Sequence, residues 1–160
     1  MKIYLIGFMG SGKSFLGKHL ADLMEREFYD LDLILENEQN LTIPEIFTLR
    51  GEKEFRKLES RLLLSGNSDG VYATGGGIVE TLANREFLLN SSGVVIWLDP
   101  DWETLYRRIR NSCRPLLSGK AEAAIFELYQ YRKTWYAQLA DIVYSGSSAK
   151  ELWELIEKPD

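Results

Sequence analysis

Gly7-Phe8-Met9-Gly10-Ser11-Gly12-Lys13-Ser14 matches the pattern G-x-x-x-x-G-K-[ST] at every fixed position. The octapeptide follows an apolar run at residues 3–6 and precedes a segment with apolar residues at helical spacing, which is the strand–loop–helix context of a phosphate-binding loop. A glycine-rich turn that only joins a strand to a helix is the alternative, but a chance match in this context is rare. The stretch therefore predicts binding of a nucleoside triphosphate.

The motif assigns chemistry to individual residues of this loop. Glycines allow successive backbone N–H groups to turn toward phosphate oxygens, and the N-terminus of the following helix adds partial positive charge. Lys13 is expected to contact the β- and γ-phosphates, and the Ser14 hydroxyl to bind Mg²⁺. The predicted nucleotide-binding residues of this segment are Gly10, Ser11, Gly12, Lys13, Ser14 and Phe15.

The amino-acid composition argues against some classes of binding partner. The 160 residues include 24 acidic and 19 basic side chains, so the chain has no overall field that would attract nucleic acid or an anionic membrane. No apolar run could span a bilayer, no signal peptide is evident at residues 1–7, and the single cysteine, Cys113, cannot form an internal disulfide. We expect a cytoplasmic monomer that binds neither nucleic acid nor membrane.

Strand and helix patterns alternate along the chain. Further strand runs lie at residues 28–30, 71–73, 94–98 and 142–144. Segments with helical spacing lie at residues 52–65, about 99–110, about 121–140 and from 148 onward. This alternation predicts an α/β fold of three layers, in which a central parallel sheet of about five strands has helices on both faces. No linker divides the chain, so residues 1–160 are expected to form one domain, with a mobile lid at about residues 111–120.

A small kinase is the class of nucleotide-binding protein that remains after exclusion. The chain contains no Asn-Lys-x-Asp segment for reading guanine, and it is too short for a motor or a large ATPase. Asp30 and Asp32 follow a predicted strand at the sheet edge where ligands bind, and residues two apart on an extended segment point the same way. One carboxylate would then assist Mg²⁺ and the other would accept a hydrogen bond from the acceptor hydroxyl. Capping of a helix that begins at Leu33 is an equal alternative for this pair.

Other polar groups suggest an acceptor site. Arg56 and Arg132 lie on separate predicted helices, and either one alone would be interpreted as a surface residue. Thr74 and the triple glycine at residues 75–77 follow a strand, where the absence of side chains allows close approach to a ligand. Asp99 before Pro100 is interpreted as a helix N-cap rather than as a metal ligand. Thr42 and Glu45 form a predicted capping box.

Six stretches, in chain order over residues 3–141, together resemble the shikimate kinase family. They are the octapeptide at residues 7–14, Asp30-Leu31-Asp32, Ile43-Pro44-Glu45-Ile46-Phe47, Gly51-Glu52 with Phe55-Arg56 and Glu59, Ala73-Thr74-Gly75-Gly76-Gly77, and Arg114-Pro115-Leu116-Leu117. Phe55-Arg56 and the triple glycine are the specific parts, because many enzymes share the phosphate loop. The resemblance implies a P-loop kinase fold and transfer of the ATP γ-phosphoryl group to the 3-hydroxyl of shikimate, on the route to chorismate and the aromatic amino acids.

The resemblance also implies residue roles. Asp32 would bind shikimate hydroxyls and accept the proton, Asp30 would support the single Mg²⁺ ion with Ser14, and Arg114 in the lid would reach the transferred phosphoryl group. The acceptor-binding segment would span about residues 31–61. The implied shikimate-binding residues are Asp32, Arg56, Gly75, Gly76, Gly77 and Arg132, and the implied catalytic residues are Lys13, Asp32 and Arg114.

The motifs leave the adenine contact open among three arginines. Arg107 is expected to pack on adenine, with Arg108 and Arg110 close enough to compete. Phe15 stands where the family has Thr or Ser, which predicts the loss of one hydrogen bond to the α-phosphate.

The chain departs from the family pattern at a second place. Thr134-Trp135 replaces the family's Pro-Leu, so Lys133 is an alternative to Arg132. Cys113 is interpreted as a spare loop thiol, and His19 as a solvent-facing residue. Trp102, Trp135 and Trp153 are interpreted as core residues.

Two other functions remain open from the sequence. A gluconate-type or related metabolite kinase would share the phosphate loop, but Arg56 and the triple glycine argue against it. A catalytically silent nucleotide-binding regulator would bind ATP without an acceptor, and the presence of Lys13, Asp32 and Arg114 argues against that class.

Overall fold

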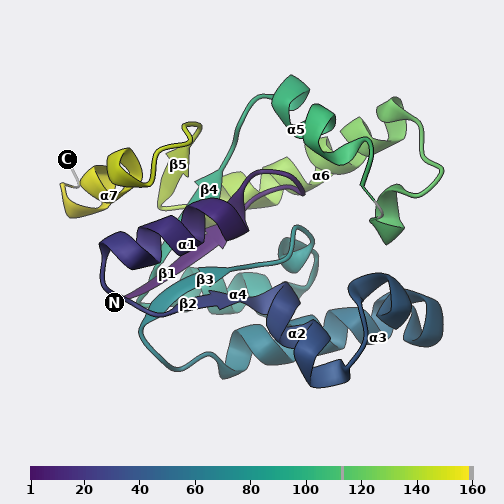
Figure 1. Cartoon of the computed structure of the whole chain (residues 1–160), viewed down its shortest axis with the longest axis horizontal. Coiled ribbons are helices and arrows are strands. Elements are labelled where there is room, and N and C mark those ends of the chain that lie inside the picture. The colour runs from purple at the N-terminus through teal and green to yellow at the C-terminus, as the bar shows by residue number, and fades with distance from the viewer. Residues whose placement is uncertain (113, 159–160) are drawn as a thin grey trace.

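The computed structural model describes residues 1–112 and 114–158, which form one parallel sheet with helices on both sides (Figure 1). The strands are β1 (Lys2–Ile6), β2 (Phe28–Asp30), β3 (Gly70–Ala73), β4 (Val94–Leu98) and β5 (Ile142–Tyr144). The helices are α1 (Lys13–Leu23), α2 (Leu31–Gln39), α3 (Ile43–Ser65), α4 (Leu82–Asn90), α5 (Trp102–Ile109), α6 (Glu122–Leu139) and α7 (Ala149–Glu157), with 3-10 turns η1 (Ile78–Glu80) and η2 (Pro115–Leu117). The five predicted strands are confirmed to within one residue. No helix within the described residues has the length and apolar character needed to cross a bilayer.

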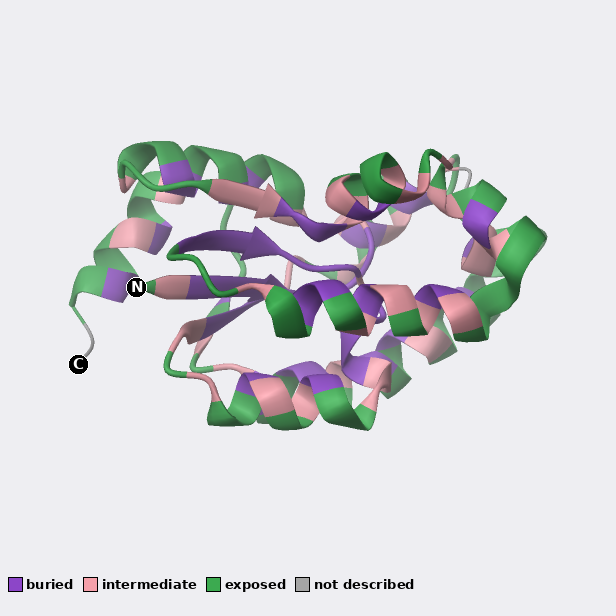
Figure 2. Ribbon diagram, turned by 90° about the horizontal axis from the view of Figure 1, so that it is seen from below, coloured by how far each residue is buried: buried purple, intermediate pink, exposed green. Residues whose placement is uncertain are grey.

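The sheet has the strand order β2-β3-β1-β4-β5, and every pairing is parallel. Alternate residues of β1 face opposite layers: Ile3 and Leu5 pack with α1 and α7, whereas Tyr4 and Ile6 pack on the side of α4 and α6. Figure 2 shows the strands buried between helices whose outer faces are exposed. The predicted three-layer α/β fold is therefore confirmed.

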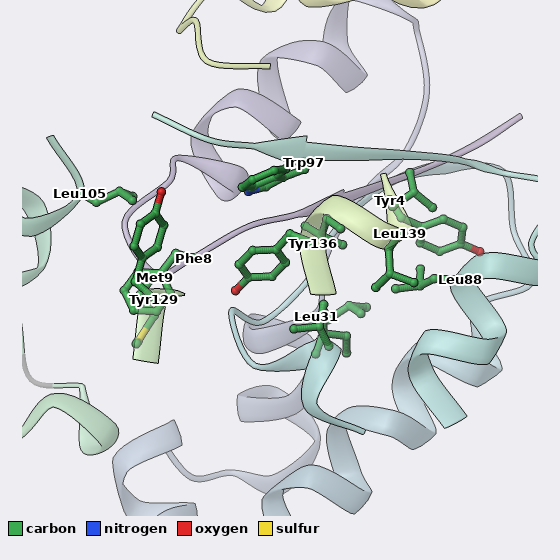
Figure 3. Packing of buried hydrophobic residues seen from close by; sticks show 14 of the residues in the cluster. Tyr4, Phe8, Met9, Leu31, Leu88, Trp97, Leu105, Tyr129, Tyr136 and Leu139 are labelled. Atoms are coloured by element: carbon green, nitrogen blue, oxygen red, sulfur yellow. The ribbon is translucent and has the colours of Figure 1, made fainter. Parts of the chain in front are cut away.

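Aromatic packing fixes α6 against the sheet. The ring of Tyr136 on α6 lies 5.9 Å from the ring of Trp97 on β4, measured between centroids. About two turns earlier on α6, Tyr129 meets Phe8 edge to face at 5.4 Å between ring centroids. Figure 3 shows these four residues within one apolar cluster. Arg132 lies between Tyr129 and Tyr136 in the sequence of α6, so the same contacts set its position.

Helix α3 consists of two parts. It begins with the predicted capping box, in which the Thr42 hydroxyl accepts from the backbone N–H of Glu45 and the Glu45 carboxylate accepts from that of Thr42. Gly51 interrupts it with φ 80° and ψ 167°, a conformation that favours glycine. The helices α2 and α3 share a small apolar cluster of their own, made of Leu35, Ile46, Phe55 and Leu62.

The predicted N-cap at Asp99 is wrong. The backbone N–H of Asp99 donates to the carbonyl of Tyr144, which continues the pairing of β4 with β5 by one residue. Helix α5 begins later, and its N-cap is Asp101, whose carboxylate accepts from the backbone N–H of Thr104 at 2.9 Å. The carboxylate of Asp99 instead accepts from the Tyr129 hydroxyl at 3.0 Å.

We expect Gly17→Ala to destabilise the protein. Gly17 lies in α1, where a Cβ would be 2.7 Å from the Phe28 ring and 2.8 Å from Cδ1 of Leu5. Alanine favours a helix by about 1 kcal/mol over glycine, but this overlap should dominate and lower the free energy of unfolding by about 1–3 kcal/mol. Urea denaturation measures the change, and exposed Lys18→Ala should shift it by less than about 0.5 kcal/mol. An increase in stability for Gly17→Ala would contradict the close packing of α1.

Candidate active site

The loop between β1 and α1 surrounds the ammonium group of Lys13. The Lys13 Nζ donates to the backbone oxygens of Gly7 at 2.7 Å and Phe8 at 2.9 Å. Gly10 and Gly12 adopt φ angles of 76° and 94°, which lie in the left-handed region. The loop therefore has the conformation that its glycines predict, with its lysine folded inside it.

The pKa of Lys13 is lowered to about 7, chiefly because burial disfavours the charged ammonium. The negative charges of Asp32 and Asp30 oppose this shift, whereas the positive charges of Arg114 and Arg132 add to it. Near neutral pH the lysine therefore exists in both protonation states, and a nearby anion would favour the charged one.

A cavity of about 510 Å³ opens over this loop. It is lined by Met9, Gly10, Gly12, Lys13, Ser14, Phe15, Asp30, Asp32, Thr74, Gly76, Arg108 and Arg114. Arg108 donates to the carbonyl of Gly10 at 2.9 Å, whereas Arg107 and Arg110 are exposed and do not line the cavity. The structure therefore favours Arg108, which the sequence left open, over Arg107 as a nucleotide contact.

Phe15 is the residue at which this cavity departs from the family pattern. Its side chain is 67% exposed and packs against the ring of His19, with 4.3 Å between the ring centroids. His19 is itself exposed, as predicted. Phe15 therefore presents an apolar surface to the cavity.

The carboxylate of Asp30 makes two separate interactions, one through each oxygen. One carboxylate oxygen caps α2 by accepting from the backbone N–H groups of Asp32 at 3.1 Å and Leu33 at 3.2 Å. The other oxygen accepts a hydrogen bond from the Ser14 hydroxyl. The expectation that Asp30 and Asp32 lie on one extended segment is wrong, because α2 begins at Leu31. Both carboxylates nevertheless line the nucleotide cavity.

A second cavity, of about 150 Å³, adjoins the first. It is lined by Met9, Asp32, Ile43, Pro44, Phe47, Phe55, Arg56, Glu59, Gly75, Gly76, Gly77, Arg114, Pro115, Leu116 and Arg132. The structure thus brings together all six residues for which the sequence implied acceptor binding. Met9, Asp32, Gly76 and Arg114 line both cavities and mark their junction.

Two arginines of the second cavity, Arg56 and Arg132, are each paired with a carboxylate. Arg56 donates through Nη1 to Oε2 of Glu59 at 2.9 Å, and Glu59 is only 2% exposed. Arg132 is 1% exposed and donates through Nε to Oε1 of Glu80 at 2.7 Å. Lys133 faces elsewhere: its Nζ lies 3.6 Å from Asp99 and does not line the cavity. The change to Thr134-Trp135 has therefore left Arg132 in the cavity.

The triple glycine makes room for these charged groups. A Cβ on Gly75 would collide with the carboxylate of Glu59, and one on Gly77 would collide with the guanidinium of Arg56. The backbone oxygen of Gly76 accepts a hydrogen bond from the Tyr136 hydroxyl. The space occupied by the ends of the Glu59 and Arg56 side chains, rather than an unusual backbone conformation, therefore favours glycine at residues 75 and 77.

Two acidic groups in the second cavity have raised pKa values. Burial raises the pKa of Glu59 to about 7, although the neighbouring Arg56 opposes the shift. Burial, followed by repulsion from Asp30, raises the pKa of Asp32, while Lys13 and Arg114 oppose this change. A carboxylate that gains affinity for a proton is suited to act as a general base toward a hydroxyl.

Three functional features were not assigned from the sequence. Glu59 belonged to a resembling stretch but had no role, and its place three residues after Arg56 on a helix is the signal that pairs them. Glu80 had no such signal, because its contact with Arg132 joins η1 to α6. Thr74, whose hydroxyl donates to the carbonyl of Leu5 at 2.9 Å, fixes the start of the glycine segment against β1.

The predicted lid is described only in part. The prediction about the Cys113 thiol concerns a residue outside the described residues. On its C-terminal side, the turn η2 follows Arg114 and contains the buried Leu117. Pro115 and Leu116 of this turn line the second cavity, and Arg114 before it lines both cavities.

Comparisons with known proteins agree with this geometry. The family model described as Shikimate kinase matches residues 9–158. A shikimate kinase from Staphylococcus epidermidis is 40% identical over 158 residues, which cover 97% of this chain and 92% of the relative. Shikimate kinase from Acinetobacter baumannii, solved in complex with shikimate, has a TM-score of 0.91 and 36% identity, with 99% of this chain and 95% of that chain covered. The enzyme from Aquifex aeolicus has a TM-score of 0.85 and 35% identity, with coverage of 98% and 96%.

Both the sequence match and the structural match extend over nearly the whole chain. The chain therefore belongs to the shikimate kinase family.

Proposed function

We propose that this chain transfers the γ-phosphoryl group of ATP to the 3-hydroxyl of shikimate. The observation that carries the proposal is the junction of two cavities, one built on the phosphate loop and the other containing Arg56 and Arg132. A planar guanidinium pair suits a carboxylate, because each can donate two parallel hydrogen bonds. Shikimate offers both a carboxylate and a hydroxyl, and the similar A. baumannii enzyme was solved with shikimate.

The nucleotide is assigned to the larger cavity. Backbone N–H groups of the loop and Lys13 would bind the phosphates, and Arg108 would contact the base. Ser14 and Asp30 fit Mg²⁺, because a hydroxyl and a carboxylate already meet at the cavity floor. Among the described residues no cluster of three or more acidic, His or Cys side chains could hold a metal alone, so phosphate oxygens would complete the coordination. The ion would neutralise charge on the phosphates.

The acceptor is assigned to the smaller cavity. Arg56 and Arg132 would bind the shikimate carboxylate, and the backbone of residues 75–77 would contact the ring and its hydroxyls. Phe47 and Phe55 provide the apolar wall against which the ring would lie. Asp32, at the junction, is then the carboxylate nearest to the transferred group.

The transfer step follows from these positions. The 3-hydroxyl proton passes to the Asp32 carboxylate as the oxygen attacks the γ-phosphorus, and the bond from that phosphorus to ADP breaks. The raised pKa of Asp32 favours proton acceptance. Lys13 and Arg114 place positive charge around the transferred group, which is the main demand of phosphoryl transfer.

The proposal also covers the domain organisation of the chain. We assign residues 1–160 to one kinase domain, with acceptor contacts concentrated in residues 31–61 and a lid at residues 111–120. Two observations support this: α2 and α3 form their own small cluster beside the sheet, and described residues of a single chain line both cavities. A second subunit is not required to build the site.

We expect the purified protein to release ADP only when shikimate is present. A coupled assay with ATP, Mg²⁺ and shikimate measures this turnover. Gluconate and related polyol acids are tested as alternative acceptors, because turnover with one of them in place of shikimate would identify a different metabolite kinase. Protein that binds ATP but shows neither turnover nor calorimetric binding of shikimate would be a silent regulator, which would refute the proposal.

We expect ATP binding near pH 8 to take up about one proton per nucleotide, because a lysine with a pKa of about 7 is largely neutral there until the triphosphate restores its charge. Calorimetry in buffers of different ionisation enthalpy measures the uptake. Lys13→Arg, which stays charged, should show almost none. Equal uptake by both proteins would assign the proton to another group.

We expect Arg56→Ala to weaken shikimate binding by about 2–5 kcal/mol while the KM for ATP changes less than about twofold. The physical reason is that the acceptor carboxylate would lose a partner inside a cavity. Steady-state kinetics in both substrates measures this. Arg61→Ala on the same helix is the matched control, because Arg61 is exposed and pairs with Glu38 outside the cavity. Equal losses for ATP and shikimate would contradict the role of Arg56.

A further inference from the structure

We infer that Glu80 is a positioning residue for the acceptor: its carboxylate holds Arg132 and Arg56 at the spacing needed for both to bind the acceptor carboxylate. Oε1 of Glu80 accepts from Nε of Arg132 at 2.7 Å, and Oε2 lies 3.7 Å from Nη2 of Arg56. One side chain on η1 therefore joins two guanidinium groups that come from α6 and α3. This inference rests on the proposed function and adds a residue to it.

The contact with Glu80 leaves donor groups available. A guanidinium presents five N–H donors in one plane, and Glu80 uses Nε of Arg132. Nη2 of Arg132 is buried and has no hydrogen-bond partner among the described residues. A buried donor without a partner is costly, so a second carboxylate entering the cavity would satisfy it. Glu80 thus orients Arg132 without occupying all of its donors.

The turn that bears Glu80 is itself fixed to α6. Nη1 of Arg85 donates to the backbone oxygens of Val79 at 2.6 Å and Glu80 at 3.1 Å. The guanidinium carbon of Arg85 lies 3.9 Å from the ring centroid of Trp135, one residue before Tyr136 on α6. Glu80 is therefore connected to α6 in two ways. It pairs directly with Arg132, and its turn is held by Arg85, which contacts the ring of Trp135.

Two effects of the Glu80 charge oppose each other. Its repulsion of the acceptor carboxylate lowers affinity, whereas its attraction keeps two like-charged arginines close together. The side chain of Glu80 is 23% exposed, so water screens part of the repulsion. Arg132 is 1% exposed and cannot turn to solvent, so without Glu80 it would reorient toward another buried carboxylate. The ordering effect dominates, and removal of Glu80 should weaken acceptor binding.

The first test separates the KM for shikimate from the other kinetic constants. We expect Glu80→Ala to raise this KM at least about tenfold, while kcat and the KM for ATP change less than about threefold. Glu80→Gln should give a smaller rise, because its amide oxygen can still accept from Arg132. Glu52→Ala is the matched control: Glu52 also pairs with Arg56, at 3.5 Å, but its side chain is 49% exposed, against 23% for Glu80, and its ion pair is with Arg56 and not with Arg132. Its KM should stay within about twofold.

The second test asks whether Glu80 acts through the arginines. The methyl ester of shikimate lacks the anionic group, so its kcat/KM should not change in Glu80→Ala, and the preference for acid over ester should fall. An unchanged or lower KM for shikimate, or equal losses for acid and ester, would overturn the inference. If Glu80→Ala fails to fold by circular dichroism, Glu80→Gln provides the same comparison.

Arg132→Ala distinguishes this inference from the proposed function. If that change leaves the preference for acid over ester intact, the assignment of the carboxylate to the arginines fails. If Arg132→Ala abolishes the preference and neither Glu80 variant reduces it, only the role of Glu80 fails.

Discussion

The parallel pairing of β1 with β3 and of β3 with β2 is the constraint on which the site depends. Leu5 pairs with Ala73, and Ala73 pairs with Asp30, so three strands end side by side. The phosphate loop, the triple glycine and the start of α2 leave the sheet at this common edge. In this strand order β1 lies between β3 and β4. The connection that leaves β1 runs to one side of the sheet, toward β2, whereas the connection that leaves β3 runs to the other side, toward β4. The phosphate loop and the triple glycine, which are more than 60 residues apart in the sequence, therefore meet at one edge of the sheet.

Charge pairing is the second organising principle. The acceptor cavity contains two arginines that are largely removed from water, and each has its own carboxylate: Glu59 for Arg56 and Glu80 for Arg132. A buried cation without a partner would be strongly destabilising. Pairing lets the fold keep positive groups in a confined space, and donors that remain free can then recognise an anion.

Local signals predicted most of the fold. Apolar runs predicted the strands other than β2, whose short Phe28–Asp30 stretch was the weakest candidate. The spacing of Thr42 and Glu45 predicted the start of α3. These patterns depend only on neighbouring residues. The N-cap of α5 was predicted wrongly at Asp99 because Asp101, two residues later, is an equally suitable N-cap. The pairing of β4 with β5 continues through Asp99, so the helix begins only after Asp101. The phosphate loop was likewise predictable from its local pattern.

The remaining site residues depended on contacts between distant elements. Arg56 and Arg132 could be grouped only through the resemblance to a family, since each one alone looks like a surface residue. The ion pair between Glu80 and Arg132 has no counterpart in sequence spacing at all. Burial of these charges is a property of the folded chain, so no local pattern could have predicted it.

The interruption of α3 at Gly51 has a consequence for how acceptor preference can change. Residues 43–50 supply Pro44 and Phe47 to the apolar wall, whereas residues 52–65 supply Phe55 and the cationic group of Arg56. Part of the apolar wall is thus carried by a segment oriented separately from the one that bears the charge. Substitutions before the break could admit a differently shaped acid during divergence or redesign, with the anion requirement left intact.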